Sequence, residues 1–280
     1  DTDYTPVVGY GGAYTSILNT GQTALAYTPP TGFKLLNTAN LPAPTYTDAR
    51  KYFAPVLYEG SGDFLTVRGC FDSTGTAWTP DWVWIKNRDA SDDHRIFDIV
   101  RGAPHYLESN NNVAQSEGGY VGTVLTNFIS GGFRVGDNVS VNTASESYVA
   151  WCWRAGGQPT LDNDNTSGAM DDGSVFKSGT VQTSYTPAGS PSIYPKKMSI
   201  AEHGGFSIVK YLGNGTDNAT VSHGLDTSLP SGGVPEMIMF KILESTRNWS
   251  VYHKDRGNTH ALRLDTTTAG IDSDAYFSDV

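Results

Sequence analysis

A repeat within the chain constrains its fold more than any other feature of the sequence. When the chain is laid on itself with a shift of 155 residues, Val67–Leu107 falls on Ser222–Leu262 without a gap. Eight of the 41 aligned positions are identical, and apolar residues recur where identity is lost. Two copies of one domain are therefore expected. The copies share the cluster Arg-Gly-x-x-His-x-Leu, present as Arg101, Gly102, His105 and Leu107 and again as Arg256, Gly257, His260 and Leu262.

The limits of the copies follow from the same alignment. Upstream the match continues with a two-residue slip, which places Tyr58 over Tyr211. The first copy is expected over residues 52–155 and the second over residues 204–280. The second copy contains no counterpart of the strand-like run Tyr148–Trp153, and a sheet that lacks closing strands exposes unpaired edges. We therefore expect the second copy to be truncated and the sequence to be part of a longer chain.

Two further segments differ from the copies in composition. Residues 156–203 are dominated by Gly, Ser, Thr, Asp, Asn and Pro, a composition that predicts an extended linker with local hairpins at most. Residues 1–50 contain three strand-like runs and are closed by proline-rich stretches around Pro29 and Pro42. We expect this segment to be the end of a separate, truncated β domain.

The secondary structure is predicted to be strand throughout. Short runs rich in β-branched and aromatic residues alternate with Gly and Pro, and no segment keeps a helical period over ten residues. This spacing is typical of all-β, tandem antiparallel β-sandwich domains. The clearest predicted strands are Trp82–Lys86, Ser147–Arg154, Phe206–Leu212, Glu236–Ile242 and Asn248–His253.

Charge and hydropathy argue against two classes of partner. The formal net charge is −10 and the isoelectric point is about 4.9, whereas a groove that follows a phosphate backbone needs Lys and Arg. We therefore expect no nucleic-acid partner. No apolar run is long enough for a membrane helix, and the first residues do not resemble a signal peptide, so no membrane insertion is expected.

The two cysteines, Cys70 and Cys152, do not have the spacing of a zinc site. Cys152 lies in an apolar strand-like run, which favours a buried free thiol. A disulfide between the two remains an open alternative.

Several runs of residues stand out in the two copies and in the segment before them. They are Pro80–Arg88, Phe97–Gly102, Gly131–Gly136 and Tyr148–Gly157 in the first copy, Ser222–Leu225 and Pro235–Lys241 in the second, and Asn19–Pro42 upstream. The runs in the two copies resemble a domain of unknown function found in large proteins of marine tailed phages, and the upstream run resembles the end of a SPRY-like domain that commonly precedes it. The resemblance implies concanavalin-like or jelly-roll sandwiches and a place on the phage particle, and it implies no catalytic residues.

The candidate sites have structural interpretations that compete with functional ones. His105 and His260 have no repeated carboxylate beside them, which favours a structural role over general acid–base catalysis. The repeated Arg and Gly fit a turn in which a guanidinium binds backbone carbonyls and the glycine adopts a positive φ. Most tryptophans alternate as core residues of a sheet would. Trp78, beside a proline in an expected loop, is the candidate for glycan contact.

No cofactor is indicated, and calcium is the one ion that any pattern would fit. Asp162 and Asp164 alternate as in the opening of a calcium loop. However, the sixth and twelfth positions hold Ser167 and Gly173 instead of a glycine and an acidic residue. A solvated linker is the favoured interpretation.

Together with the resemblance, these observations predict a non-enzymatic structural protein of a tailed phage, in a tail fibre or similar appendage. The expected purpose, recognition of host-surface glycans, rests on the resemblance alone. Other virion proteins and a homotrimer are the expected partners, and the particle, assembled in the host cytoplasm, is the expected location. A capsid-decorating or tail-scaffold protein without receptor contact is one alternative. A glycan-degrading tail depolymerase is another, and it requires two carboxylates roughly 5–10 Å apart.

Overall fold

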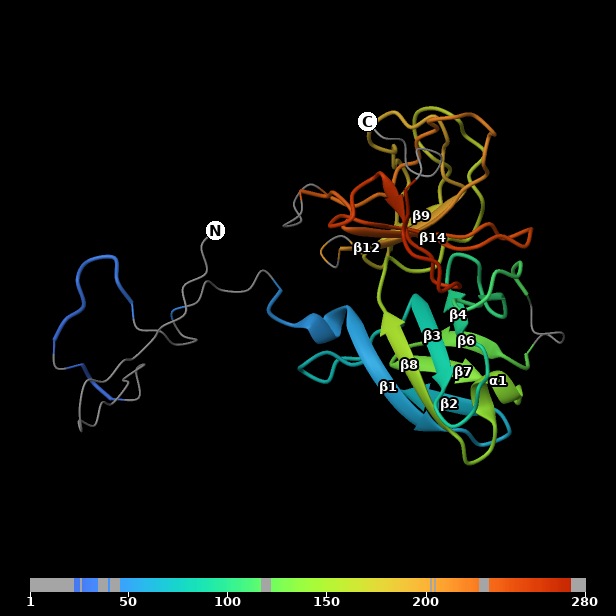
Figure 1. The fold of residues 1–280 in the computed structure, drawn as a ribbon, viewed down its shortest axis with the longest axis horizontal. Coiled ribbons are helices and arrows are strands. Elements are labelled where there is room, and N and C mark those ends of the chain that lie inside the picture. The colour runs from blue at the N-terminus through green and yellow to red at the C-terminus, as the bar shows by residue number, and fades with distance from the viewer. Residues whose placement is uncertain are drawn as a thin grey trace. The chain divides into compact units, whose positions relative to one another are not determined.

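A computed structural model describes residues 23–25, 27–34, 40, 46–116, 122–201, 203, 205–226 and 232–272. The chain divides into two compact units, Asp1–Thr47 and Asp48–Val280, and the elements described below all belong to the second. The expected end of a separate β domain over residues 1–50 lies largely outside the described residues. The second unit is built from strands, with one 3-10 turn, η2 (Ala49–Lys51), and one helical turn, α1 (Val139–Asn142) (Figure 1). None of the helices in the described ranges could cross a membrane.

The first repeat is an antiparallel β-sandwich. Its larger sheet has the order β1-β8-β3-β4-β5 and its smaller sheet the order β2-β7-β6. Gly131, with φ +83°, lies in the tight turn that joins the last two strands of the smaller sheet. The strands are β1 (Phe53–Glu59), β2 (Leu65–Arg68), β3 (Trp82–Asn87), β4 (Arg95–Asp98), β5 (Tyr106–Leu107), β6 (Leu125–Ile129), β7 (Gly132–Val135) and β8 (Ser147–Trp153).

The core of this sandwich lies between the two sheets. In β3 the side chains alternate, so that Val83 and Ile85 point inward and are fully buried, while Trp82 and Trp84 point to the opposite face. Phe133 of β7 closes the core from the smaller sheet. The prediction of an all-β fold with antiparallel sheets is therefore confirmed.

The second repeat keeps the hairpin of the first. β13 pairs with β14 in the register Met237↔His253, and β3 pairs with β4 in the register Trp82↔Asp98, which is the same register after the shift of 155 residues. The bridge Ile96↔Leu107 likewise recurs as Val251↔Leu262. The repeat seen in the sequence is thus a repeat of backbone pairing. The remaining strands are β9 (Val175–Lys177), β10 (Thr180–Val181), β11 (Lys197–Ala201), β12 (Phe206–Lys210), β13 (Met237–Phe240), β14 (Ser250–His253), β15 (His260–Ala261) and β16 (Ile271–Asp272).

The segment 156–203, expected to be an extended linker, is folded. It supplies β9, β10 and β11, which join β12 in a sheet of order β10-β9-β11-β12, with β9 and β11 parallel. Met170, Val175, Met198 and Ile200 form a small buried core beside this sheet. The polar composition of this segment suggested that it could not form a core. The few apolar residues are far apart in the sequence, but the fold brings them together.

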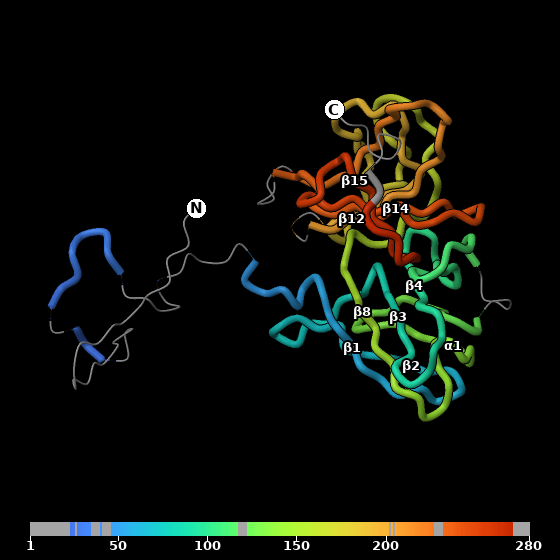
Figure 2. Tube along the Cα trace, in the orientation of Figure 1, coloured from blue at the N-terminus to red at the C-terminus, as the bar shows by residue number. Residues whose placement is uncertain are grey.

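The two repeats pack directly against each other. Trp249, at the start of β14, is buried in a cluster with Ile96 and Leu107 of the first repeat, and its indole N–H donates to the carbonyl of Glu108 at 2.8 Å. Backbone bonds from Gln115 to Leu243 and from Arg247 to Asn112 join the same two loops. Figure 2 shows the chain passing from β8 into the second repeat, whose strands lie over the end of β4. The repeats therefore form one packed body.

Candidate functional site

An array of aromatic rings covers the outer face of the larger sheet, the face turned away from the sandwich core. Trp82 lies opposite Trp153 and Trp84 opposite Trp151 across the β3–β8 ladder. The rings of Trp84 and Trp151 meet edge to face with centroids 5.9 Å apart, and Phe53 lies 4.8 Å from Trp153. We call Phe53, Trp82, Trp84, Trp151 and Trp153 the aromatic face. All five side chains are half-buried.

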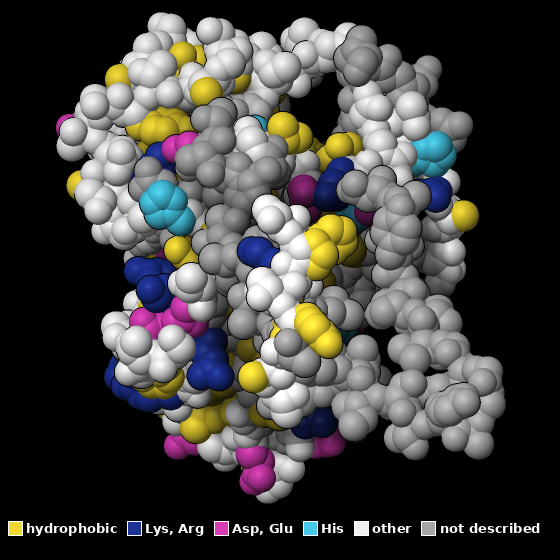
Figure 3. All heavy atoms as spheres, turned by 90° about the vertical axis from the view of Figure 1, so that its left-hand side faces the viewer, with side chains coloured by type: hydrophobic (Ala, Val, Ile, Leu, Met, Phe, Trp, Pro, Cys, Tyr) yellow, Lys and Arg dark blue, Asp and Glu magenta, His cyan; other side chains and the backbone are white. Residues whose placement is uncertain are grey.

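The second repeat covers only part of this face. Trp82 packs against Phe206 of β12, with centroids 6.1 Å apart, and Trp84 borders the cluster around Trp249. Towards β1 the face stays open, where Pro55 is exposed and Leu57 is 67% exposed. Figure 3 views the side of the molecule on which β1 lies in Figure 1, with hydrophobic side chains in small groups among polar ones. Trp151 therefore sits between a covered half and an open half of the face.

Polar contacts fix the orientation of one ring. The indole N–H of Trp84 donates to Nδ1 of His94 at 2.8 Å, and the two rings meet edge to face. Burial, followed by the charge of Lys86, lowers the pKa of His94, which keeps Nδ1 free to accept this bond. The orientation of the Trp84 ring is thus fixed by its neighbours.

The candidate chosen from the sequence for glycan contact is placed elsewhere. Trp78 is only 4% exposed and belongs to the core between the two sheets. No ring face of Trp78 is free to meet a sugar, so this prediction is wrong. The tryptophans whose rings lie on the outer face are instead Trp82, Trp84, Trp151 and Trp153. Their alternation along the strands had been interpreted as that of core residues. The alternation was correct, but it cannot tell the inner face of a sheet from the outer one.

The repeated Arg-Gly-x-x-His-x-Leu motif forms a turn in the first repeat. Arg101 donates from Nε to Asp98 at 2.5 Å and from its guanidinium to the carbonyl of Ile96 at 3.0 Å, and Gly102 has φ +81°. Nδ1 of His105 lies 3.3 Å from the carbonyl of Gly102. These contacts hold the backbone after β4.

In the second repeat the same turn keeps its glycine but changes its polar contacts. Gly257 has φ +75° and its N–H donates to the carbonyl of His253, as that of Gly102 does to Asp98. Arg256 is exposed, and Nδ1 of His260 lies 2.7 Å from Oγ1 of Thr259. Leu262 bridges to β14, as Leu107 pairs with β4. The backbone conformation is what the two copies share.

A family model agrees with this duplication. The model described as a domain of unknown function, DUF7483, matches residues 48–190 and, a second time, residues 182–280. This chain belongs to the DUF7483 family. The two matches meet without a gap, in keeping with the folded state of residues 156–203. No curated protein and no solved structure matches the chain.

The acidic pair of the candidate calcium loop binds lysines in the structure. Asp162 contacts Lys197 at 3.6 Å and Lys210 at 3.3 Å, and Asp164 contacts Lys196 at 3.0 Å. In the described part of the chain no three His, Cys, Asp or Glu side chains gather as metal ligands. The positive charge beside these two carboxylates, which a calcium ion would supply in a calcium loop, therefore comes from lysine ammonium groups.

Buried Asn163 organises the same loop. Its side-chain amide donates to the carbonyls of Asn165 and Pro195, and its oxygen accepts the backbone N–H of Asp171 at 3.0 Å. The loop is thus closed by an amide side chain within the DUF7483 fold.

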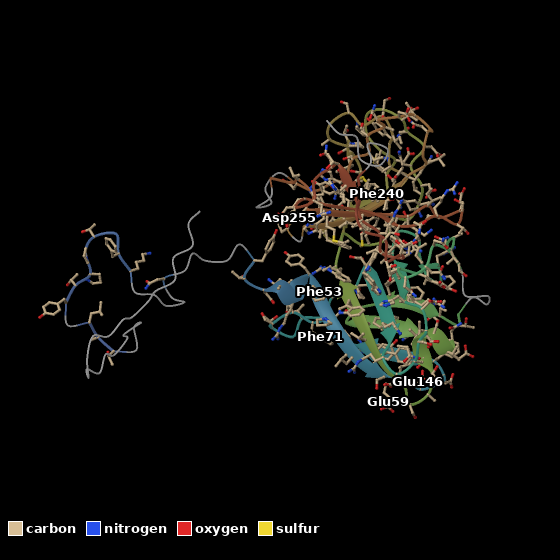
Figure 4. All side chains as sticks on the ribbon, in the orientation of Figure 1. Phe53, Glu59, Phe71, Glu146, Phe240 and Asp255 are labelled. Atoms are coloured by element: carbon tan, nitrogen blue, oxygen red, sulfur yellow. The ribbon has the colours of Figure 1, made fainter. Side chains whose placement is uncertain are left out.

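A pair of carboxylates does occur in the first DUF7483 repeat. The amide nitrogen of buried Asn87 donates to Asp92 at 2.7 Å and to Glu146 at 2.6 Å, and the hydroxyl of Tyr148 lies 3.3 Å away. Figure 4 shows Glu146 near Glu59 at the end of the sandwich, and the N–H of Gly60 donates to the carbonyl of Glu146. Sequence spacing could not reveal this pair, because its members lie more than 50 residues apart.

The two cysteines lie in the same core as free thiols. Cys70 follows β2 and Cys152 lies in β8, and both are fully buried. Hydrogen bonding to Cys70 and burial raise the pKa of Cys152 well above its usual value. The interpretation of Cys152 as a buried free thiol is confirmed, and Cys70 is a buried free thiol as well.

One buried carboxylate holds the exit from the first DUF7483 repeat. Asp81 accepts the N–H of Ala155 at 2.6 Å, just where the chain leaves β8. Burial raises the pKa of Asp81 to about 6, and the bond from Ala155 and the charge of Arg154 oppose that rise only in part. Sequence reasoning missed this residue, although its position beside Pro80 at the start of a repeated strand was a usable signal.

Proposed function

We propose that this chain is a non-enzymatic structural component of a tailed bacteriophage particle, part of a tail fibre or similar appendage. In this proposal its first repeat contributes to recognition of host-surface glycans. The phage setting is supported by the resemblance of the sequence to virion proteins. Glycan contact is supported by one structural observation, the half-buried rings of the aromatic face, of which Trp84 and Trp151 meet edge to face.

The chemistry of sugars explains why this face suits a glycan. The ring faces of many pyranoses carry axial C–H groups that pack on aromatic rings, while their hydroxyls need polar neighbours or water. Trp151 offers a half-buried indole, which meets Trp84 edge to face, beside the exposed Pro55 and Leu57. Amphipathic aromatic side chains suit contacts of this kind, in which one surface is apolar and the other wet. We therefore expect a shallow site that binds one or two sugar rings.

A glycan array probed with residues 1–280 tests this function. We expect binding to a subset of bacterial surface glycans, and W151A should weaken it at least about ten-fold, the equivalent of one lost aromatic contact. F64A is the matched control, because Phe64 is 71% exposed and lies in the loop between β1 and β2, outside the aromatic face. Absence of binding to every host glycan would favour the scaffold or capsid-decorating alternative.

The depolymerase alternative has its own candidate residues in Asp92 and Glu146. Both bind the amide of buried Asn87, which favours a structural role in the β3–β4 loop. If the pair were catalytic, the wild-type chain would release sugars from a bound glycan and E146Q would not. We expect no release from either protein, measured by reducing-end assay.

The expected homotrimer and the contacts with other virion proteins belong to the same proposal. Mass measurement by light scattering on the purified chain tests the trimer. Cross-linking of intact particles, assembled in the host cytoplasm, tests the neighbours. A monomer at every concentration would argue against a fibre built by this segment alone.

A further inference from the structure

The two cysteines of the chain enter the core of the first repeat from opposite sheets. Cys70 follows β2 of the smaller sheet, Cys152 lies in β8 of the larger sheet, and both are fully buried. The N–H of Cys70 donates to the carbonyl of Gly131 at 3.2 Å, and its carbonyl accepts the N–H of Trp78 at 3.0 Å. Cys152 belongs to the ladders that β8 forms with β1 and β3. The backbone of each sheet therefore fixes the position of its cysteine.

A close approach of the backbone at Gly69 brings the two sheets together beside these cysteines. A Cβ atom at Gly69 would lie only 2.7 Å from a methyl group of Val56, so a residue without a side chain is needed there. Val56 and Ala54 are successive inward residues of β1, and Ala54 lies opposite Cys152 in the ladder. The approach thus places Cys70, the residue after Gly69, over the part of the larger sheet that holds Cys152.

The side chains of the two cysteines meet in this part of the core. Both belong to one cluster of buried residues, and hydrogen bonding to Cys70, followed by burial, raises the pKa of Cys152 well above its usual value. A disulfide requires two cysteines on facing elements whose Cβ atoms are about 3.5–4.5 Å apart. Two thiols that meet across a sandwich core are in the arrangement from which such a bridge closes.

We propose that Cys70 and Cys152 form a redox lock, an inter-sheet disulfide that closes when the protein meets an oxidant. Sandwiches of the immunoglobulin type join their two sheets by a bridge of this kind. The two cysteines are 82 residues apart in the sequence, and a bridge that closes so long a loop strongly restricts the unfolded chain. The lock therefore stabilises the sandwich that carries the aromatic face.

The chemistry of the lock is thiol–disulfide exchange with a small disulfide such as oxidised glutathione. One protein thiolate attacks this disulfide and releases a first glutathione thiolate, and the other protein thiolate then displaces the second. The protein thiols give up two electrons and two protons, and the glutathione released takes up both. Burial of both sulfurs disfavours the attacking thiolate, so exchange requires local opening of the sandwich.

The timing of the lock follows from the proposed function, and this step alone rests on it. The host cytoplasm keeps thiols reduced, whereas the surroundings of a released particle are oxidising. The sandwich is thus assembled with free thiols and is locked after release.

Equilibration of residues 1–280 with mixtures of reduced and oxidised glutathione tests the lock. We expect a monomer lighter by about 2 Da, the mass of two hydrogens, in which peptide mapping without reduction joins the peptides of Cys70 and Cys152. The equilibrium constant for bridge formation should be at least about 30-fold larger in the native protein than in urea, because a bridge and the fold that it stabilises favour each other equally. The constant should be the same when it is approached from the reduced and from the oxidised protein.

The C70A/V135C variant is the matched control. Val135 is fully buried in the same core, but it pairs with Leu65 at the end of the smaller sheet opposite to Cys70. This variant keeps two buried thiols and separates them, so its equilibrium constant should be no larger in the native protein than in urea. A native bridge as stable as that of the wild type would contradict the geometry of the lock.

Three results on the wild-type protein would refute the lock. They are equal equilibrium constants in the native and unfolded protein, disulfide-linked dimers in place of the monomer, and glutathione adducts in place of the bridge.

Alkylation of released phage particles in denaturant, before any reduction, tests the timing. We expect Cys70 and Cys152 to be alkylated only after reduction, and alkylation without reduction would overturn the locking after release. Absence of the chain from the particles would overturn the proposed function instead, and the purified protein would still decide the lock.

Discussion

The β3–β4 and β13–β14 hairpins have the same pairing register and differ in what covers them. Behind β3 lies a complete second sheet, and the inward side chains of that strand are fully buried. Behind β13 no such sheet is present among the described residues, and the corresponding side chains are half-exposed. The two hairpins thus share their backbone pairing, while the burial of their inward side chains differs.

The polar contacts around the two hairpins differ even where the backbone is the same. Arg95 forms an ion pair with Glu108 at 2.7 Å in the first repeat. At the same two positions the second repeat has Ser250 and Arg263, whose guanidinium donates to the serine hydroxyl at 2.9 Å. The arginine thus occupies the first of the two positions in one repeat and the second in the other, and the two positions are joined by a hydrogen bond in both repeats. A contact can therefore be preserved while both of its residues change.

Substitution of equivalent aromatic residues by alanine should give the largest difference in stability between the repeats. Phe97 is fully buried in the sandwich core, whereas its counterpart Tyr252 is partly exposed. F97A should lower the free energy of unfolding of the first repeat by about 3–5 kcal/mol, because it leaves a cavity. Y252A should cost about 1 kcal/mol. Denaturant unfolding followed by tryptophan fluorescence measures both, and equal costs would contradict the comparison.

The packing between the repeats should give the next largest effect. W249A empties the buried cluster shared by the two repeats and removes the bond to Glu108, and we expect a loss of about 3 kcal/mol. The control is H94A at the equivalent position of the first repeat, where the ring is half-buried and about 1 kcal/mol is expected. W249F should fall between them, since it keeps the packing and loses only the N–H donor. Hydrogen exchange in β4 and β14 would show whether the repeats separate before they unfold.

The smallest expected difference between the repeats concerns the pH dependence of stability, because a carboxylate is buried in one repeat and exposed in the other. Asp81 is buried, with a pKa of about 6, while its counterpart Glu236 is exposed and pairs with Lys254. A raised pKa means that the folded state holds the proton more tightly. The stability contributed by this group is therefore complete below pH 3.8 and is lost as the pH rises through about 6.

The D81N variant isolates the contribution of Asp81 to the pH dependence of the free energy of unfolding. Between pH 4 and pH 7 the wild-type protein should lose on the order of 2 kcal/mol relative to D81N, because asparagine remains neutral. The comparison between the two proteins cancels the carboxylates of lowered pKa, such as Asp48 and Asp72, whose contributions have the opposite sign. Parallel unfolding curves for wild type and D81N over this range would exclude the effect.

Much of the fold could be predicted from local sequence patterns. The five clearest predicted strands correspond to β3, β8, β12, β13 and β14 to within two residues at each end. The duplication was visible because the hairpin and its turn need the same glycine and the same apolar positions in both copies. Alternation along β3 also sorted its side chains correctly onto two faces of the sheet.

The candidate site was less predictable, because it depends on which face of the sheet meets which partner. Trp78 lies in a loop and Trp151 in a strand, and neither position along the chain reveals which ring is covered. One fills the core between the sheets, and the other lies on the outer face. The pair formed by Asp92 and Glu146 likewise depends on the loop after β3 meeting the start of β8. Neither the placement of the two tryptophans nor the pairing of the two carboxylates can be recognised from the residues next to them in the sequence.

The sequence alone determined that this chain contains two related copies built from strands, since periodicity, turn glycines and repeated apolar positions are local properties. The tertiary structure decided two further matters. It folded the polar segment 156–203 and turned the tryptophans of β3 and β8 to an outer face. Each of these results from contacts between residues far apart in the chain, where the free energy of burial depends on the partner that arrives and not on the residue itself.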